Sequence, residues 1–169
     1  MKENETASPQ KDIFELHEAT RSLIMSTKNA KGALETSYAP YVFYNECYYV
    51  LVSGLAPHGR NFETNPDIGI LLIEDEEKTK NIFARARLSY SVTAVKVERQ
   101  TDEFSEVTAK LKERTGKTVD VLVGLEDFNL FRLEPHEGRF IIGFGKAYLL
   151  NAKTKEIVHV DKDVLNSQK

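Results

Sequence analysis

The sequence has no tryptophan and a single cysteine, Cys47. One cysteine excludes a disulfide within the chain and a cysteine-based metal site, and it fits a reducing compartment. Because Cys47 lies in an apolar run rich in tyrosine, we interpret it as a small buried hydrophobic residue and not as a nucleophile.

Long hydrophobic runs are also missing. No stretch approaches the ~20 apolar residues that a membrane-spanning helix needs. Residues 1–11 are polar, and the apolar run of a signal peptide does not follow them. We therefore expect a cytoplasmic protein with no membrane partner.

Positive charge is not in excess. The sequence has 23 lysines and arginines and 26 acidic residues, which gives a net charge of −3 and an isoelectric point of about 5.9. No nucleic acid is expected as a partner, because neutralising phosphates demands a basic face. What is present, 169 residues with 41% hydrophobic and 29% charged side chains, is typical of one soluble globular domain.

The apolar pattern predicts a mainly β domain with short α insertions (α+β). We expect a disordered N-terminus over residues 1–10, a domain over 11–160 and a C-terminal tail over 161–169. About seven strands with short connections favour antiparallel pairing in a closed or split β-barrel. The expected strands are 21–27, 33–38, 46–53, 67–73, 85–99, 128–133 and 139–150, and the expected helices are 12–20, 58–65, 74–84, 103–114 (capped by Thr101) and 118–124.

Proline and glycine refine the predicted strands. Pro40 is expected to end the second strand, and the apolar run 67–73 is expected to be buried on both faces. A hairpin turn is expected at 134–138, where the sequence reads Glu-Pro-His-Glu-Gly. Gly143 and Gly145 lack the spacing of a phosphate-binding loop, so we expect them inside a strand, at a bulge or a close backbone approach.

The stretch from residue 37 to residue 87 combines glycine, proline, histidine and arginine with strand-like runs. Arg85 and Arg87 stand two residues apart at a predicted strand start, so both side chains would point to one face. Two forked donors on one face suit a phosphate or carboxylates. The alternatives are a solvated strand end or ion pairing with the acidic residues 74–77. We interpret the stretch as a pocket for a flat anionic ligand.

Four histidines and one aspartate are the other candidates for chemistry. His17 and His136 are interpreted as solvated surface residues. His58 opens a helix, where it either meets an anion beside free backbone N–H groups or caps the helix. His159 is either a packing residue or an axial ligand of haem iron, and Asp127 either orients a histidine or belongs to a strand-entry turn. No histidine pair has zinc-ligand spacing.

Seven short motifs occur together and in order between residues 23 and 160, and through them the chain resembles the haem-utilisation (HugZ/HutZ-type) branch of the pyridoxamine 5′-phosphate oxidase-like, FMN-binding split barrels. Each motif is weak alone, and their order makes the resemblance specific. The motifs are Tyr38-Ala-Pro, Val52-Ser-Gly-Leu-Ala-x-His with Arg60-Asn61, Asn65-Pro, Ile73-Glu-Asp-Glu, Ile82-Phe-Ala-Arg-x-Arg-Leu, Asp127-Phe-x-Leu-Phe-x-Leu-x-Pro and Gly138-Arg-Phe-Ile-x-Gly-Phe-Gly-x-Ala-Tyr.

The resemblance implies a six-stranded antiparallel split barrel that forms a homodimer with two clefts at the interface. In flavin-binding relatives the cleft holds FMN; in the haem-utilisation branch it holds haem, which is opened oxidatively with release of iron. There an aspartate matching Asp127 supports the iron's axial histidine across the interface, and an arginine matching Arg85 or Arg87 lies near the haem. The family's tail histidine falls near Val164 here, which leaves His159 as the candidate ligand.

Three functions follow as hypotheses. The first is a haem-binding, haem-degrading oxidoreductase with an external electron donor, in which His159 or a solvent ligand holds the iron and Arg85 or Arg87 pairs with a propionate or organises bound oxygen. The second is an FMN-dependent oxidoreductase, and the third is a haem- or flavin-binding protein without catalysis. The predicted site residues are Arg85, Arg87 and Asp127 for catalysis, Tyr38, Ser53, His58, Asn61, Arg85 and Arg87 for the cofactor, and His159 for the iron.

Overall fold

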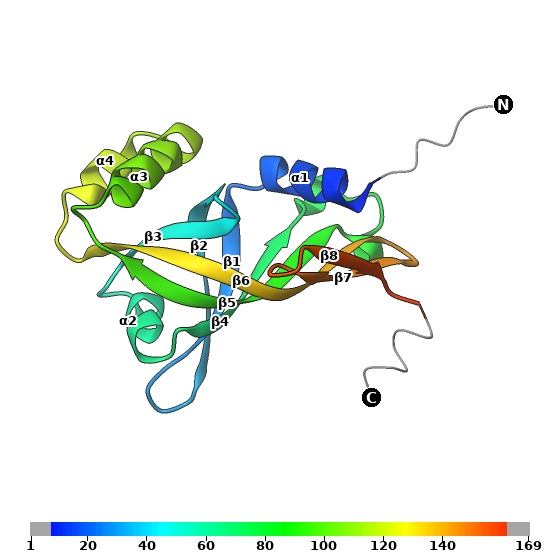
Figure 1. The fold of residues 1–169 in the computed structure, drawn as a ribbon, viewed down its shortest axis with the longest axis horizontal. Helices are drawn as coiled ribbons and strands as arrows, with labels where there is room; N and C mark the ends of the chain where they lie inside the picture. Colours follow the sequence, from blue (N-terminus) through cyan, green and yellow to red (C-terminus); the bar gives the residue numbers. More distant parts are fainter. Residues whose placement is uncertain (1–7, 162–169) are drawn as a thin grey trace.

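The computed structural model describes residues 8–161, and its strands form one antiparallel sheet in the order β3-β2-β1-β4-β5-β6-β7-β8 (Figure 1). The long strand β6 also pairs with β3, so β1 to β6 close into a barrel while β7 and β8 extend from the second half of β6. The predicted six-stranded split barrel is confirmed. The strands are β1 (Ser22–Lys28), β2 (Leu34–Tyr44), β3 (Cys47–Ser53), β4 (Asp67–Ile73), β5 (Arg87–Val97), β6 (Phe128–Gly143), β7 (Lys146–Asn151) and β8 (Glu156–His159).

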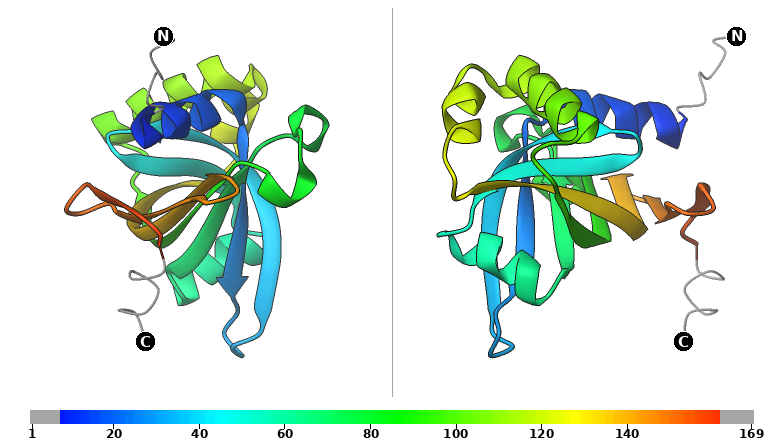
Figure 2. Two further views of the ribbon diagram at one scale, coloured as in Figure 1. Left: turned by 90° about the vertical axis from the view of Figure 1, so that its right-hand side faces the viewer. Right: turned by 60° about the vertical axis from the view of Figure 1, so that its left-hand side comes forward.

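The helices are short and lie outside the barrel (Figure 2). The first begins at Pro9, which a first helical turn tolerates, so the predicted disorder is wrong for residues 9–10. The acidic segment 74–84 forms two separate 3₁₀ turns and not the expected helix. No helix within residues 8–161 is long and apolar enough to cross a membrane. The elements are α1 (Pro9–Ala19), α2 (Pro57–Thr64), η1 (Glu76–Lys78), η2 (Ile82–Ala84), α3 (Asp102–Thr115) and α4 (Thr118–Val123).

Two apolar cores stabilise the barrel, one inside it and one under α3. Strand β3 contributes to both, because its inner face lines the barrel and its outer face lies beneath α3. The prediction that 67–73 is buried on both faces is wrong, because β4 alternates and its outer side chains stay partly exposed. The fully buried inner residues include Leu23, Met25, Tyr41, Tyr48, Leu72, Leu88, Leu133 and Phe140, and the core under α3 includes Val42, Tyr49, Leu51, Phe104, Val107, Leu111 and Leu130.

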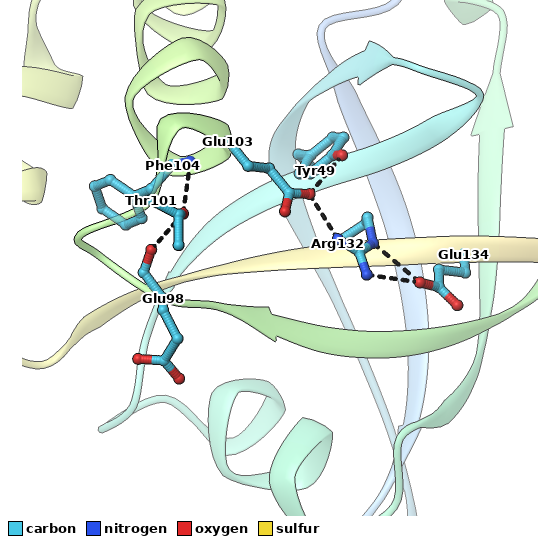
Figure 3. A network of polar contacts seen from close by, with 7 residues as sticks. All are labelled: Tyr49, Glu98, Thr101, Glu103, Phe104, Arg132 and Glu134. Atoms are coloured by element: carbon cyan, nitrogen blue, oxygen red, sulfur yellow. Dashed lines mark hydrogen bonds and ion pairs between the residues drawn. The ribbon is translucent and has the colours of Figure 1, made fainter.

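A polar network at the start of α3 fixes this helix on the barrel (Figure 3). Thr101 accepts a hydrogen bond from the Phe104 N–H, which confirms the predicted cap. Glu103, in the first turn, accepts bonds from the Tyr49 hydroxyl on β3 (2.9 Å) and the Arg132 guanidinium on β6 (2.7 Å). These bonds lower the pKa of the Glu103 carboxyl although its burial acts in the opposite direction. The network therefore joins α3 to both strands that close the barrel.

Three predicted strand boundaries are wrong for tertiary reasons. Pro40 does not end a strand, because it lies where β2 stops pairing with β1 and starts pairing with β3. The expected turn at 134–138 is extended, because β6 continues along β5 beyond a bulge opposite that segment. The chain turns at Gly145 instead, whose φ of +68° suits glycine. A register shift beside Gly143 confirms the expected bulge, although Gly145 lies in the turn and not inside a strand.

Candidate functional site

A groove of about 980 Å³ runs across the outer face of the sheet, from β1 through β4 and β5 to the β7–β8 extension. Strand alternation produces it, because side chains that point away from the barrel core have no helix over them here. Ile24 and Val158 are apolar residues on this face, 38% and 45% exposed. Between them the lining alternates aliphatic side chains with serines and charged residues, so the groove offers a ligand both apolar contact and polar partners. Other lining residues are Ser26, Leu71, Ser89, Ser91, Glu137, Arg139 and Leu149.

Arg139 is a groove residue that the sequence reasoning missed. It lies opposite Ser89 on the outer face, next to the buried Phe140, and its exposed side chain makes no ion pair or hydrogen bond with any described residue. An unpaired guanidinium above apolar walls can bind a carboxylate or a phosphate. The signal was strand alternation, because the inward position of Phe140 turns Arg139 toward the groove.

Arg85 and Arg87 do not act as one pair of donors. Arg85 precedes β5, and its Nε donates to the Glu74 carbonyl at 2.6 Å while a guanidinium nitrogen lies 3.9 Å from the Glu76 carboxylate. This is the ion-pairing alternative that the sequence left open. Arg87 is the first residue of β5, on the same face as the groove residue Ser89, and it donates to the Arg85 carbonyl at 2.9 Å. Arg87 is therefore the better placed of the two for a ligand in the groove.

Ser53 and Asp127 form a tight pair at the opposite end of the barrel. The Ser53 hydroxyl donates to the Asp127 carboxylate at 2.5 Å, and the Gly54 N–H donates to the Asp127 carbonyl at 2.6 Å. These bonds join the end of β3 to the start of β6, as the strand-entry alternative expects. One carboxylate oxygen of Asp127 is thus engaged within the chain.

Helix α2 holds the next two predicted residues. His58 lies in its first turn, where burial lowers the pKa of the imidazole. The predicted cap is wrong, because the N-cap is Ala56 and no side chain caps the helix. Asn61 is buried, and its amide donates to the Thr27 hydroxyl at 2.9 Å and the Glu35 carboxylate at 2.6 Å. Asn61 therefore attaches α2 to β1 and β2.

His159 and Tyr38 are exposed on the sheet. His159 lies on β8, its Nε2 is 2.7 Å from the Gly145 carbonyl, and its ring packs edge-on against Tyr148. Because a carbonyl only accepts, Nε2 carries the hydrogen and Nδ1 keeps its lone pair. Tyr38, 68% exposed, lies on β2 directly opposite the groove residue Ile24 of β1.

The two histidines interpreted as solvated differ. His136 is exposed, on β6, with Nε2 2.8 Å from the Thr93 hydroxyl. For His17 the interpretation is wrong: it is buried, its Nε2 lies 2.8 Å from the Tyr48 hydroxyl, and its ring stacks on Phe43. Burial and the nearby Arg114 lower the pKa of His17 to about 4. The available signal was its position four residues after Ile13 on the apolar stripe of α1.

Within one chain most of the predicted site residues separate into two groups. Ser53, His58, Asn61 and Asp127 surround α2 at one end of the barrel. Arg87 and His159 lie at the other end, where β5, β6, β7 and β8 are in register. One chain therefore does not bring all of them to a single ligand.

The six-stranded antiparallel split barrel is the fold of the pyridoxamine 5′-phosphate oxidase-like proteins. The chain belongs to the pyridoxamine 5′-phosphate oxidase family, whose model matches residues 10–142. It is a homologue of the heme oxygenase HutZ of Vibrio cholerae serotype O1 (strain ATCC 39315 / El Tor Inaba N16961), 41% identical over 152 residues, which cover 89% of this chain and 86% of that protein.

Solved structures agree with this assignment. HutZ from Vibrio cholerae, described as a heme storage protein, matches with a TM-score of 0.76 and 39% identity over 80% of this chain and 96% of its own. Campylobacter jejuni ChuZ matches with a TM-score of 0.83 and 30% identity over 94% of this chain and 64% of its own. A heme binding protein from Mycobacterium smegmatis, 20% identical with a TM-score of 0.78, shares the fold.

Proposed function

We propose that this protein binds haem and degrades it oxidatively, as a cytoplasmic oxidoreductase that takes electrons from an external donor. The observation that carries the proposal is the 41% identity, over nearly nine-tenths of the chain, to a protein named heme oxygenase. The groove supports it as well, because its lining combines aliphatic side chains, which suit a flat macrocycle, with an arginine that suits a carboxylate.

The groove offers haem both an apolar surface and cations. Leu71 and Leu149 would contact the macrocycle, and Arg139 would bind a propionate, since its guanidinium has no partner among the described residues. Arg87 extends the same face and would bind the second propionate. Arg85 is already engaged by Glu74 and Glu76, so we give it the lesser role.

His159 is the proposed axial ligand. Within one chain it lies beside Tyr148, on the face of β8 opposite the groove residue Val158, so the His159 that binds the iron would come from a second copy of the chain. Its Nδ1 lone pair is available, because Nε2 donates to the Gly145 carbonyl, and that bond orients the ring. A donor imidazole with its other nitrogen hydrogen-bonded suits haem iron. Haem bound there is the substrate, and opening its ring consumes dioxygen and reducing equivalents and yields a linear tetrapyrrole and iron.

The His159 assignment is tested by haemin titration. The wild-type protein is expected to give a saturating Soret band that decays under ascorbate and oxygen. His159→Ala should shift the Soret maximum and weaken haemin binding by about tenfold, while His136→Ala, an exposed histidine on the neighbouring face, should change neither. An unshifted Soret band in His159→Ala would remove the ligand role, and absence of a wild-type Soret band would contradict haem binding itself.

We also propose that the protein is a homodimer whose two copies meet through the outer groove face. Ile24, Tyr38 and Val158 expose apolar surface there, which a second copy would cover. The resemblance implies that Asp127 of one copy supports the axial histidine of the other, and a dimer is needed for this because a single chain keeps Asp127 and His159 at opposite ends.

Sedimentation tests the dimer. The wild-type protein should sediment as a dimer at about 10 μM, and Ile24→Arg, which inserts a charge into the proposed interface, should shift it to monomer. Leu55→Arg is the matched control, because Leu55 is 74% exposed but lies in the loop before α2. A monomeric wild-type protein, or a dimer that Ile24→Arg leaves intact, would contradict this interface.

Two alternatives remain, each favoured by one observation. The description of HutZ as a heme storage protein favours haem binding without degradation, in which case the Soret band persists under ascorbate and oxygen. The family model favours FMN, with Ser53 and His58 near the phosphate and Tyr38 near the isoalloxazine. Flavin absorption in the purified protein would support that alternative.

A further inference from the structure

A second cavity, of about 550 Å³, lies between α1, the β2–β3 hairpin and the β7–β8 hairpin. We call it the α1 cavity. Tyr90, Leu150, Asn151 and Glu156 line both hollows and form the wall between them. On the β7–β8 hairpin, Leu149 and Val158 line only the groove, whereas Ile157, which pairs with Leu150, lines only the α1 cavity. Its size is within the range of small-molecule sites.

Aromatic rings form the walls of the α1 cavity. Phe14, on the outer side of α1, is 63% exposed, and Phe43, on β2, is 40% exposed. The His17 ring stacks on Phe43 with centroids 4.5 Å apart and planes 13° apart, and Tyr48 lies beneath both. Exposed ring faces beside a hollow favour a planar aromatic ligand, since aromatic pairs gain from offset stacking.

The charged residues of the lining are three glutamates, at positions 18, 46 and 156, against Arg114 and Lys155, so the wall has no positive excess that would attract an anion. His17 is neutral at ordinary pH, because burial and Arg114 lower the pKa of its imidazole to about 4. Arg114 is engaged by the Glu18 carboxylate at 3.7 Å and by two backbone carbonyls of α1 and its C-terminal end. Lys155 pairs with Glu46 across the mouth, joining the tips of the two hairpins.

We propose that the α1 cavity binds an uncharged, planar aromatic molecule, stacked between Phe14 and the His17–Phe43 pair. The site is separate from the groove, and its ligand differs from haem and FMN in carrying no carboxylate or phosphate. The proposal goes beyond haem degradation and does not depend on it.

The probe is N-phenyl-1-naphthylamine, an uncharged fluorophore that brightens in apolar sites. At pH 7.5 we expect saturable binding, one probe per chain, with a dissociation constant of about 10 μM. Its analogue 8-anilinonaphthalene-1-sulfonate, which adds one negative charge, should bind at least about tenfold more weakly. Equal affinity for the two probes, or no saturable binding of the neutral probe, would overturn the proposal.

A pair of phenylalanine variants locates the probe. Phe14→Ala should weaken binding of the neutral probe by about tenfold, through loss of one stacking wall. Phe83→Ala is the matched control, because Phe83 is 82% exposed and outside the cavity lining. Both side chains are exposed, so both variants should fold, which circular dichroism checks. Loss of binding in Phe83→Ala, or none in Phe14→Ala, would contradict the site.

Haemin separates this cavity from the groove. A haemin titration followed by its Soret band should be the same with and without saturating N-phenyl-1-naphthylamine, and the same in Phe14→Ala. If the probe and haemin compete and Phe14→Ala weakens both, the cavity is a haem site and the proposal fails. If haemin does not bind at all while the probe binds as expected, only the proposed haem function fails.

Discussion

Gly59→Ala is expected to destabilise the protein by about 2 kcal/mol. A Cβ at this position of α2 would lie 2.2 Å from the Ser53 carbonyl oxygen and 3.0 Å from its carbon, so it meets backbone that cannot rotate away. Overpacking of this kind costs about 3 kcal/mol, whereas alanine gains about 1 kcal/mol over glycine in a helix. The clash therefore outweighs the propensity gain. Urea unfolding measures the difference.

Gly143→Ala is the control for this variant. A Cβ there would meet only the end of the Lys146 side chain, at 3.9 Å, and the backbone is not in the left-handed region. We expect a change within about 0.5 kcal/mol. If Gly59→Ala were as stable as Gly143→Ala, helix α2 would not be held against β3 as closely as the structure has it. We expect α2 to be held closely because its buried Phe62 packs against Phe131, with the two ring centroids 4.9 Å apart.

The free energy of unfolding is expected to fall by about 2 kcal/mol between pH 7.5 and pH 5.0 because of His17. The pKa of His17 is about 4 in the folded protein and 6.5 ordinarily, so between these values the unfolded chain binds the proton and the folded chain does not. The contribution of neutral His17 to the free energy of unfolding is therefore complete above pH 6.5 and is lost as the pH falls toward 4. His58, whose pKa is also lowered by burial, adds to the loss in the same direction.

His17→Gln identifies the source of this pH dependence. Glutamine does not titrate, so the variant should start less stable at pH 7.5, through the altered bond to Tyr48, but lose about 2 kcal/mol less on acidification. His136→Gln, at an exposed histidine, should keep the wild-type pH dependence. Chemical unfolding at the two pH values gives the numbers. If the free energy of unfolding of His17→Gln falls as much on acidification as that of the wild type, His17 is not the group that titrates.

The fold was largely predictable because its signals are local. Apolar alternation, a continuous apolar run and tyrosine- and valine-rich segments bounded by turns located the six barrel strands, and Thr101 marked the start of α3. The failures occurred where a partner strand overrides a local breaker. Pro40 continues β2 because it lies at the change from one partner to another, and residues 134–138 stay extended because β5 runs beside them.

The candidate site was less predictable than the fold. Residue types in the stretch 37–87 predicted a pocket for a flat anionic ligand, which stays a prediction. Spacing alone paired Arg85 with Arg87, whereas in the structure Glu74 and Glu76 hold Arg85. Arg139 was missed because strand alternation gives only its outward direction, which a solvated arginine shares. Its exposure above a groove depends on strands that are far apart in the sequence.

The sequence alone determined two things: that the fold is a mainly β split barrel, and that the chain belongs to a family with haem- and flavin-binding relatives. Both follow from the sequence because alternation and ordered motifs are properties of short segments. Only the tertiary structure decided which groups are free and which are engaged. His17 is a buried neutral imidazole because α1 packs it against Tyr48 and Phe43. Asn61 connects α2 to β1 and β2 because its amide donates hydrogen bonds to side chains of both strands. Such roles depend on contacts between distant segments, which no local pattern encodes.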